Sequence, residues 1–348
     1  MDDVPFYFYQ QCCQLLSAHG LWAAQELSGY YGLLASSVLK DWADYSTTIK
    51  DGIERESFIV HPGTNRKIVT SLEIEAVPKK FVRNLSICLQ DAKDETVSLK
   101  LLRRLPYAEC NFVLFSPTIN EAWVDFANSL KRLGPVCMKQ KKFDSNAIRL
   151  LQKLVAGQKL STLTVYAEAC ENIMDELTSL LCQNQFEKLV IWNYHQGRWT
   201  GAAVRHLLEF WSQNSEKLKG KNLLLQEGCS GGVDQLEQFV LPRALKADPT
   251  KKVSTLQEVL EFSSKKECDF IDKEYRHNHF YFAKPSCVYK FEEGEGGEKH
   301  RIYISFEIAV QVTKKFPTAK RQHRPANFNG RRDLHLMRNT NDLHILFA

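Results

Sequence analysis

The chain has 348 residues and a net charge of +5, with 44% hydrophobic and 25% charged residues. These proportions are typical of a folded globular protein and exclude general disorder, and the length allows a large core divided between two structural units. No apolar run approaches the roughly 18 residues that would predict a membrane span, so we expect no membrane contact.

The ten cysteines are scattered along the chain, and their only close pair is Cys12-Cys13. Others lie inside apolar runs, as Cys88 and Cys137 do. This pattern is typical of reduced thiols in a core and not of a disulfide framework. The N-terminus also lacks the basic residues of a secretory signal. We therefore expect an intracellular protein, cytoplasmic or nuclear.

Residues 1–45 predict a compact helical unit. It opens with Val4-Pro5, and proline is tolerated at a helix start. Leucines follow at mixed spacings of mostly three to six residues among many aromatic residues, and Gly20, Gly29 and Gly32 divide the segment into two or three short helices. A unit this small cannot bury so many large apolar side chains, so some of them should face a partner or the next domain.

Residues 46–80 predict a β-hairpin that bridges the helical unit and the rest of the chain. Residues 56–61 and 68–74 alternate between apolar and polar side chains as strands do, and the turn-forming residues 62–65 lie between them. Because exposed sheet edges are normally covered, we expect this hairpin to cap the open edge of the following sheet.

From about Phe81 to about Leu245, a short apolar run followed by a helical pattern recurs. The runs are centred on Ile87, Val113, Cys137, Leu163, Leu189 and Leu224. The steps between these centres are 26, 24, 26, 26 and 35 residues, and leucine-rich repeats have a period of about 20 to 29. Each unit supplies one strand and one helix that must stack on its neighbours. The sequence therefore predicts an α/β fold, a degenerate leucine-rich-repeat-like solenoid over residues 81–313.

The helices of these repeats have recognisable N-terminal signals. Thr118 and Glu121 form a capping-box pattern before one helix, and Asp144 can cap the next. The apolar residues that follow each cap recur every three or four positions, which favours helices packed on a common core.

The long step before Leu224 indicates an inserted loop around residues 193–200. Insertions in repeat proteins map to loops, often on the binding face. Aromatic and arginine residues are the usual anchors of protein interfaces. We therefore predict that a target protein binds four residues of this region: Trp192, Tyr194, Arg198 and Trp199.

From residue 254 the pattern changes to one more helix over 256–262, a strand at 279–282, and a hairpin. The hairpin joins residues 288–291 and 301–308 around a flexible tip at 293–298. Residues 314–348 form a basic tail in which we expect low order. The segment Lys314–Arg332 alone carries +7, which leaves −2 for the rest of the chain.

The N-terminal unit resembles an F-box motif. The resemblance rests on Pro5 after an apolar residue, the leucines in short helices and Trp42 near the end of the unit. The opening Met-Asp-x-Val-Pro-Phe is similar to a large, rapidly diverging group of F-box-like nematode proteins. Such proteins commonly carry the motif at the N-terminus with leucine-rich or other repeats behind it, which is the order found here.

This resemblance implies a non-enzymatic, substrate-recruiting subunit of an SCF-type ubiquitin ligase. The N-terminal helices would dock on the ligase adaptor, and the repeat domain would bind an unknown target protein. On this resemblance the adaptor-binding residues are Pro5, Leu15, Leu16, Leu21 and Leu27. A second interpretation is a repeat scaffold whose basic tail, Lys314–Arg332, binds nucleic acid or acidic proteins.

Two patterns resemble chemical sites. Residues 228–232, Gly-Cys-Ser-Gly-Gly, are similar to the glycine-framed serine of trypsin-like proteases and to loops that hold phosphate. A nucleophilic serine needs a base and an orienting carboxylate, and the Gly-Lys-Ser/Thr ending of a P-loop is absent, so we favour a flexible strand–helix loop. Zinc ligands are expected in two close pairs, unlike the spacing of Cys268, His277, His279 and Cys287. We predict no catalytic residue, no cofactor and no metal.

Overall fold

The computed structural model describes residues 5–16, 18–62, 64, 66–91, 96–115, 120–131, 133–193, 199, 201–250, 252–275, 280–282, 284–294, 299–308, 322–324 and 326–348. The chain divides into two compact units, Met1–Val136 and Cys137–Ala348. Within the described ranges, no helix has both the length and the apolar character needed to cross a membrane.

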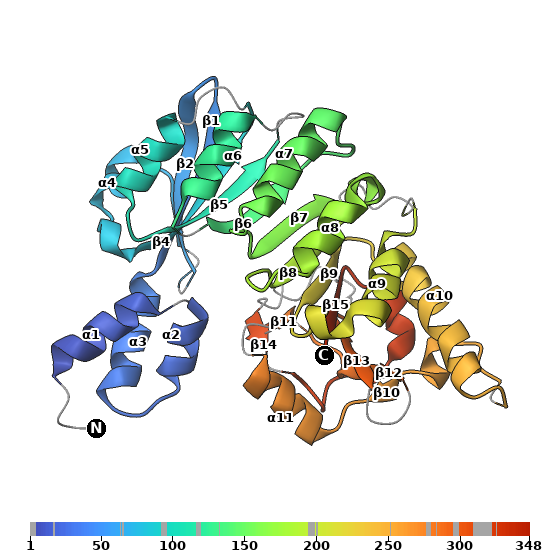
Figure 1. The fold of residues 1–348 in the computed structure, drawn as a ribbon. Coiled ribbons are helices and arrows are strands. Elements are labelled where there is room, and N and C mark those ends of the chain that lie inside the picture. Colours follow the sequence, from blue (N-terminus) through green and yellow to red (C-terminus); the bar gives the residue numbers. More distant parts are fainter. Residues whose placement is uncertain are drawn as a thin grey trace, which may run out of the picture. The chain divides into compact units, whose positions relative to one another are not determined.

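The first unit begins with three helices that pack on one another (Figure 1): α1 (Phe6–Leu15), α2 (Ala18–Gln25) and α3 (Tyr30–Asp41). Strands and helices follow in the order β1 (Ala43–Lys50), β2 (Ile53–His61), β3 (Arg66–Ile68), α4 (Ser71–Ala76), η1 (Lys79–Phe81), β4 (Val82–Leu89), α5 (Thr96–Arg104), β5 (Glu109–Leu114) and α6 (Glu121–Ser129). Strand β6 (Leu133–Met138) contains the boundary between the units.

The second unit continues the alternation of strands and helices and ends in antiparallel strands. Its elements are α7 (Ser145–Ala156), β7 (Thr162–Tyr166), η2 (Ala167–Ile173), α8 (Met174–Leu181), β8 (Lys188–Trp192), α9 (Ala203–Leu218), β9 (Asn222–Gln226), α10 (Ser230–Ala247), η3 (Leu256–Glu258), β10 (Glu261–Phe262), α11 (Lys265–Glu274), β11 (Phe280–Phe282), β12 (Tyr289–Glu293), β13 (His300–Phe306), β14 (Gln322–Arg324), η4 (Leu334–Asn339) and β15 (Asp342–Phe347).

Thirteen strands form one mixed sheet in the order β10-β12-β13-β15-β9-β8-β7-β6-β5-β4-β1-β2-β3. The β4–β5, β7–β8 and β8–β9 pairs are parallel, and a helix follows each of these strands. The six predicted apolar runs are the strands β4 to β9, which lie side by side in chain order. The predicted α/β class is therefore confirmed.

Local sequence explains why these units alternate between strand and helix. In β4, Leu85, Ile87 and Leu89 are buried at every second position, as expected for a strand with one face on a core. In α7, leucines recur on one buried face, and the Asp144 side chain accepts a hydrogen bond from the Ala147 backbone N–H at 2.7 Å. The predicted helix start at Asp144 is confirmed.

The bridge between the helices and the repeats differs from its prediction. Strands β2 and β3 pair antiparallel across the expected turn, with Ile59 opposite Ile68. The second predicted strand, however, becomes helical from Ser71, because the Thr70 side chain caps α4 by accepting from the Glu73 backbone N–H. Strand β1 was not predicted, and it lies between β2 and β4.

Helix starts and short elements account for the other differences. Helix α6 begins at Glu121 and is capped by Asn120, whereas the predicted cap at residue 118 lies outside the described residues. The helix predicted over 256–262 is only a short 3-10 turn followed by β10. The predicted 288–308 hairpin is present as β12 and β13, which pair antiparallel.

The end of the chain is folded, contrary to our expectation of low order. Strand β15 pairs antiparallel with both β9 and β13. Its Leu343, Ile345 and Phe347 side chains are fully buried, and the Phe347 ring stacks 6.0 Å from that of Trp211. Residues 309–321, which hold part of the basic segment, lie outside the described residues. The final apolar run is therefore a core strand of the second unit.

Candidate functional site

The helices α1, α2 and α3 share a small core of their own. Its buried residues are Cys13, Leu21, Ala24, Ala35 and Trp42, with Leu16, Tyr31, Leu34, Val38 and Leu39 packed against them. Within residues 5–39, Glu26 is the only Asp, Glu, Lys or Arg, although a quarter of the whole chain is charged. The surface of this unit therefore carries little charge before Lys40 and Asp41, which end α3.

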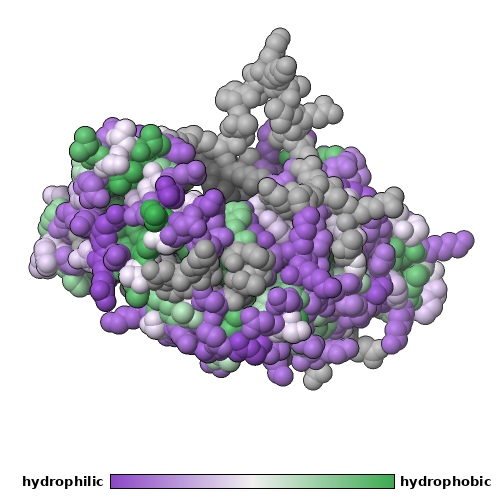
Figure 2. All heavy atoms as spheres, turned by 90° about the horizontal axis from the view of Figure 1, so that it is seen from above, coloured by the Kyte–Doolittle hydropathy of each residue, from purple (hydrophilic) through white to green (hydrophobic). Residues whose placement is uncertain are grey.

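Seven large apolar side chains are exposed on or next to these helices. Hydrophilic residues dominate the coloured part of the surface in Figure 2, so such a concentration is informative. The exposed fractions are 56% for Phe6, 68% for Tyr7, 57% for Phe8, 75% for Leu15, 55% for Leu27, 69% for Tyr30 and 70% for Leu33. We call these seven residues the N-terminal apolar surface. An uncharged surface of this kind favours burial against another protein.

The structure separates the predicted adaptor-binding residues into two groups. Leu15 and Leu27 belong to the N-terminal apolar surface, and Pro5 is exposed just before α1. Leu16 is half-buried, and Leu21 is fully buried in the helical core. Leu21 is therefore a structural residue and not a contact residue.

Sequence reasoning missed most of the N-terminal apolar surface. The density of aromatic residues near the N-terminus was visible, but spacing alone did not tell which of them face solvent. Tyr9 and Tyr31 illustrate the difficulty, because their rings pair at 5.8 Å while Phe8 and Tyr30 next to them are exposed. The near absence of charged residues between 5 and 39 was the signal that could have identified the whole unit.

A second candidate site lies in the second unit, at the carboxyl end of β8. Trp192, the last residue of β8, lies 5.8 Å from the Tyr166 ring at the end of β7. The Lys139 ammonium lies 4.7 Å from the centre of the Trp192 ring. Ligands of parallel sheets commonly bind at such carboxyl ends. Two of the four predicted target-binding residues, Tyr194 and Arg198, lie outside the described residues.

The two ends of the inserted loop are fixed on the same carbonyl group. The Trp199 indole N–H donates to the Gly228 carbonyl at 2.9 Å, and the Asn193 amide donates to the same oxygen at 3.2 Å. A Cβ atom at Gly231 would lie only 2.6 Å from the Trp199 side chain, so glycine is required there. Trp199 therefore anchors the loop, whereas Trp192 is half-buried beside Tyr166 and Lys139.

The glycine-rich segment 228–232 holds the loop in place, because it supplies the Gly228 carbonyl and the space that Gly231 leaves for Trp199. Gly228 and Cys229 lie in the turn between β9 and α10, with Cys229 as the N-cap residue, and residues 230–232 are the first residues of α10. Burial and the nearby Asp342 raise the pKa of the Cys229 thiol, whose Sγ–H donates to the Leu225 carbonyl. A buried, protonated thiol is a poor nucleophile. The arrangement supports a packing role for this segment.

Only two of the four residues whose spacing was compared with zinc sites, Cys268 and Cys287, are described by the structure. Cys268 and Cys287 are both buried, and the Cys287 thiol donates to the Gly330 carbonyl at 2.9 Å. His277 and His279 lie outside the described residues. Among the described side chains, no group of three or more His, Cys, Asp or Glu residues has a geometry suited to a metal ion.

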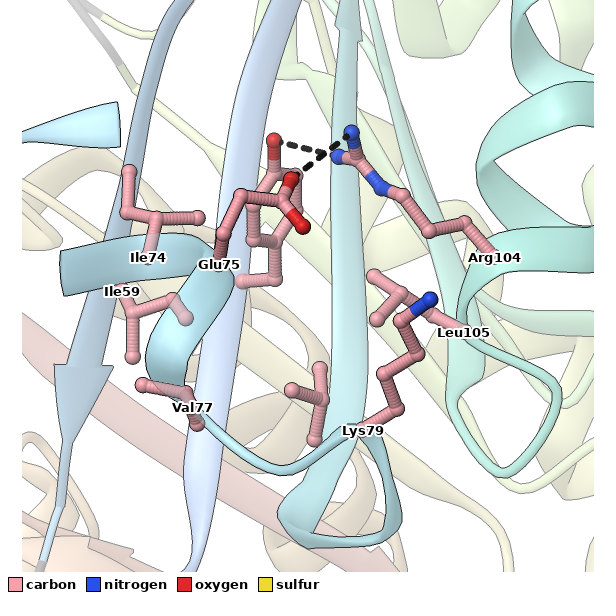
Figure 3. Close-up of a pocket in the computed structure, with 9 residues that line it drawn as sticks. Ile59, Ile74, Glu75, Val77, Lys79, Arg104 and Leu105 are labelled. Atoms are coloured by element: carbon pink, nitrogen blue, oxygen red, sulfur yellow. Dashed lines mark hydrogen bonds and ion pairs between the residues drawn. The ribbon is translucent and has the colours of Figure 1, made fainter. Parts of the chain in front are cut away.

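A small cavity in the first unit is shown in Figure 3. Arg104 donates to the Tyr45 hydroxyl at 2.7 Å and to Glu54 at 3.0 Å, and it forms an ion pair with Glu75 at 3.8 Å. Burial and the Glu54 carboxylate raise the pKa of Tyr45 to about 12. The cavity holds about 20 Å³, roughly one water. These contacts tie α5 to the β1–β2 hairpin and leave no room for a substrate.

No family model, no curated protein and no solved structure matches this chain.

Proposed function

We propose that this chain is a non-enzymatic, substrate-recruiting subunit of an SCF-type ubiquitin ligase. The helices α1 to α3 bind the ligase adaptor, and the region around Trp192 contacts a target protein. The chain performs no chemistry, and it raises the effective concentration of the target near the ligase. The observation that carries this proposal is the N-terminal apolar surface on an almost uncharged three-helix unit.

The adaptor contact is assigned to the exposed side of α1 and its neighbours. Phe8 and Leu15 lie seven positions apart on α1 and are both exposed, so they occupy one helix face. Leu27 and Leu33 add apolar area from the α2–α3 loop and from α3. Burial of apolar area is worth about 25 cal/mol per Å², so a few such side chains supply several kcal/mol before association costs.

The proposal includes a leucine-rich-repeat-like arrangement of the strand–helix units. Strands β4 to β9 are neighbours in chain order, and helices α5 to α9 join them one after another. Crossovers between parallel strands are right-handed, so a sheet built in one direction has its helices on one face. This topology supports a single-wound stack, in which the region around Trp192 belongs to one edge.

The test is co-purification of the full-length chain with the SCF adaptor. Phe8→Ser and Leu15→Ser replace exposed side chains, so neither should lower the melting temperature. We expect each variant to retain less adaptor than the unmodified chain, and the double variant to retain none. Point variants are preferable to a truncation at residue 46, which would remove the start of β1.

Leu72→Ser is the matched control, because Leu72 is 87% exposed and lies on α4, outside the three-helix unit. It should leave adaptor retention unchanged. Absence of retention by the unmodified chain, or equal loss in the control, would remove the ligase proposal. The repeat scaffold with a basic tail would then be tested next.

A further inference from the structure

The chain passes from the three-helix unit into the sheet of the first unit at Trp42. This residue is the C-cap of α3, and β1 begins directly after it at Ala43. The Trp42 side chain is only 6% exposed and belongs to the separate core of the helices, together with Leu21 and Ala35. Whatever fixes Trp42 to the sheet therefore also fixes the N-terminal apolar surface relative to it.

Hydrogen bonds connect Trp42 to three strands of this sheet. The Trp42 indole N–H donates to the Asp44 carboxylate on β1 at 2.7 Å, and the Asn84 amide on β4 donates to the same carboxylate oxygen at 2.8 Å. The His61 Nδ1–H on β2 donates to the Trp42 carbonyl at 3.0 Å. Each contact involves Trp42 or the oxygen that binds its indole, so the contacts form one cluster.

An irregularity in β4 places a cation beside the same ring. The register of β1 against β4 shifts between Ala43 and Asp44, which leaves Arg83 as an extra residue in β4. Bulges of this kind redirect a side chain. The Arg83 guanidinium lies 5.9 Å from the centre of the Trp42 ring, within the range of a cation–π contact. The Trp42 joint is our name for five residues: Trp42, Asp44, His61, Arg83 and Asn84.

The Trp42 joint contains a half-buried carboxylate. Burial raises the pKa of Asp44, and this effect exceeds the lowering by the hydrogen bonds from Trp42 and Asn84 and by the nearby His61. The other charged group of the joint is Arg83 on β4. A raised pKa means that the closed joint binds a proton more tightly than an open joint in which water reaches Asp44. The joint is therefore weaker at neutral pH than in acid.

We propose that the Trp42 joint opens and closes while the helices and the sheet stay folded, and that opening lets the three-helix unit turn against the sheet. Opening breaks the hydrogen bonds of the joint, but Trp42 stays in the core of the helices, and sheet residues such as Leu85 and Ile87 stay in theirs. Asp44 is a positioning residue that acts through Trp42. The inference rests on the proposed function only in identifying the ligase adaptor as what the turning surface binds.

The test is hydrogen exchange of the indole N–H groups in the full chain, followed by NMR, with Trp42→Phe to assign the signal. Trp123 on α6 is 1% exposed and packs 5.5 Å from the Phe112 ring of β5, so its indole reports unfolding of the sheet. We expect the Trp42 indole to exchange at least roughly tenfold faster than the Trp123 indole at pH 7. Asp44→Ala removes the acceptor and should increase this ratio roughly tenfold.

The pH profile separates a positioning role from a merely structural one. The ratio of the two exchange rates should decrease as pH falls from about 7 to about 5, because protonation of Asp44 favours the closed joint. Asp44→Asn keeps an acceptor oxygen and removes the charge, so it should remove most of this pH dependence. Asp51→Asn is the control, because it makes the same change at the exposed turn between β1 and β2 and should alter neither the ratio nor its profile.

Three results would overturn the proposal: equal exchange of the Trp42 and Trp123 indoles, an unchanged ratio in Asp44→Ala, or the same effects in Asp51→Asn as in Asp44→Asn. Adaptor retention tests the other proposal separately. Asp44→Ala leaves the N-terminal apolar surface in place and should retain the adaptor as the unmodified chain does. Absence of retention by the unmodified chain would remove the ligase proposal, whereas the exchange ratio would still decide whether the joint opens.

Discussion

His344 shows how strongly the fold constrains the protonation of one residue. It lies on β15 between Leu224 of β9 and Ser305 of β13, and it is only 4% exposed. Burial, together with the nearby Lys188, lowers the pKa of His344 to about 3 from its ordinary value of 6.5. The imidazole is therefore neutral in the folded protein at neutral pH.

The lowered pKa of His344 predicts that the folded protein becomes less stable in acid. Below pH 6.5 the unfolded chain binds a proton at His344 that the folded chain does not bind, so stability falls as pH falls toward 3. At about pH 4 the loss from this group amounts to roughly 3 kcal/mol. His344→Leu should remove this part of the pH dependence. Urea unfolding of both proteins at several pH values measures it, and an identical pH dependence would contradict the prediction.

Single residues also show which features of the sites could not be predicted from the sequence. The resemblance to an F-box motif implied Leu15, Leu21 and Leu27 together as adaptor contacts, but a sequence pattern does not distinguish the core side of a small helix from its outer side. The fold does, because Leu21 packs against Cys13 and the other two side chains face solvent. Similarly, Trp199 was a good interface candidate by type, and its contact with Gly228 makes it an anchor.

At the scale of elements, the predictable parts were those set by local pattern. Strands β4 to β9 and the β12–β13 hairpin are continuous apolar or alternating runs bounded by turn residues, so they could be located from the sequence. Helix α4 could not be located in this way. Its residues alternate between apolar and polar as in a strand, but the Thr70 side chain caps a helix there. The position of β15 in the sheet also could not be predicted, because its partner strand β9 lies more than 100 residues earlier in the chain.

Strand β15 gives a prediction at this scale. Because it fills the place between β9 and β13, its side chains belong to the core, and Ile345→Ala should lower the free energy of unfolding by about 2–5 kcal/mol. Leu72→Ala, at a position 87% exposed, should change it by less than about 0.5 kcal/mol. Chemical denaturation of both variants measures the difference. Similar values would mean that the C-terminal segment is not part of the core.

At the scale of the whole molecule, a run of strands in chain order is extended at both ends. One end begins with β1, which is parallel to β4, and continues with antiparallel pairs, and the other end has antiparallel pairs only. The chain adds β1, β2 and β3 beside β4, and β15, β13, β12 and β10 beside β9. The last strands, β3 and β10, have only three and two residues, which limits the exposed edge. The period of the apolar runs predicted the central strands, whereas the additions at the ends depend on contacts distant in sequence.

The distribution of charge over the molecule separates the two functional interpretations. The N-terminal apolar surface lies in a segment with one charged side chain, whereas the basic residues gather between 314 and 332. Some of that basic segment makes internal contacts, since the Arg332 guanidinium lies 5.1 Å from the Phe262 ring centre. Binding through the N-terminal helices should therefore depend on apolar area, and binding through the tail on ionic strength.

The most direct measurement is the dissociation constant of the purified full-length chain and the SCF adaptor at low and at high salt. Apolar docking through α1 to α3 predicts saturable binding with nearly the same constant at both, because few charges are involved. No binding, or an affinity that falls steeply as salt rises, would contradict the proposal that the N-terminal apolar surface is the adaptor contact.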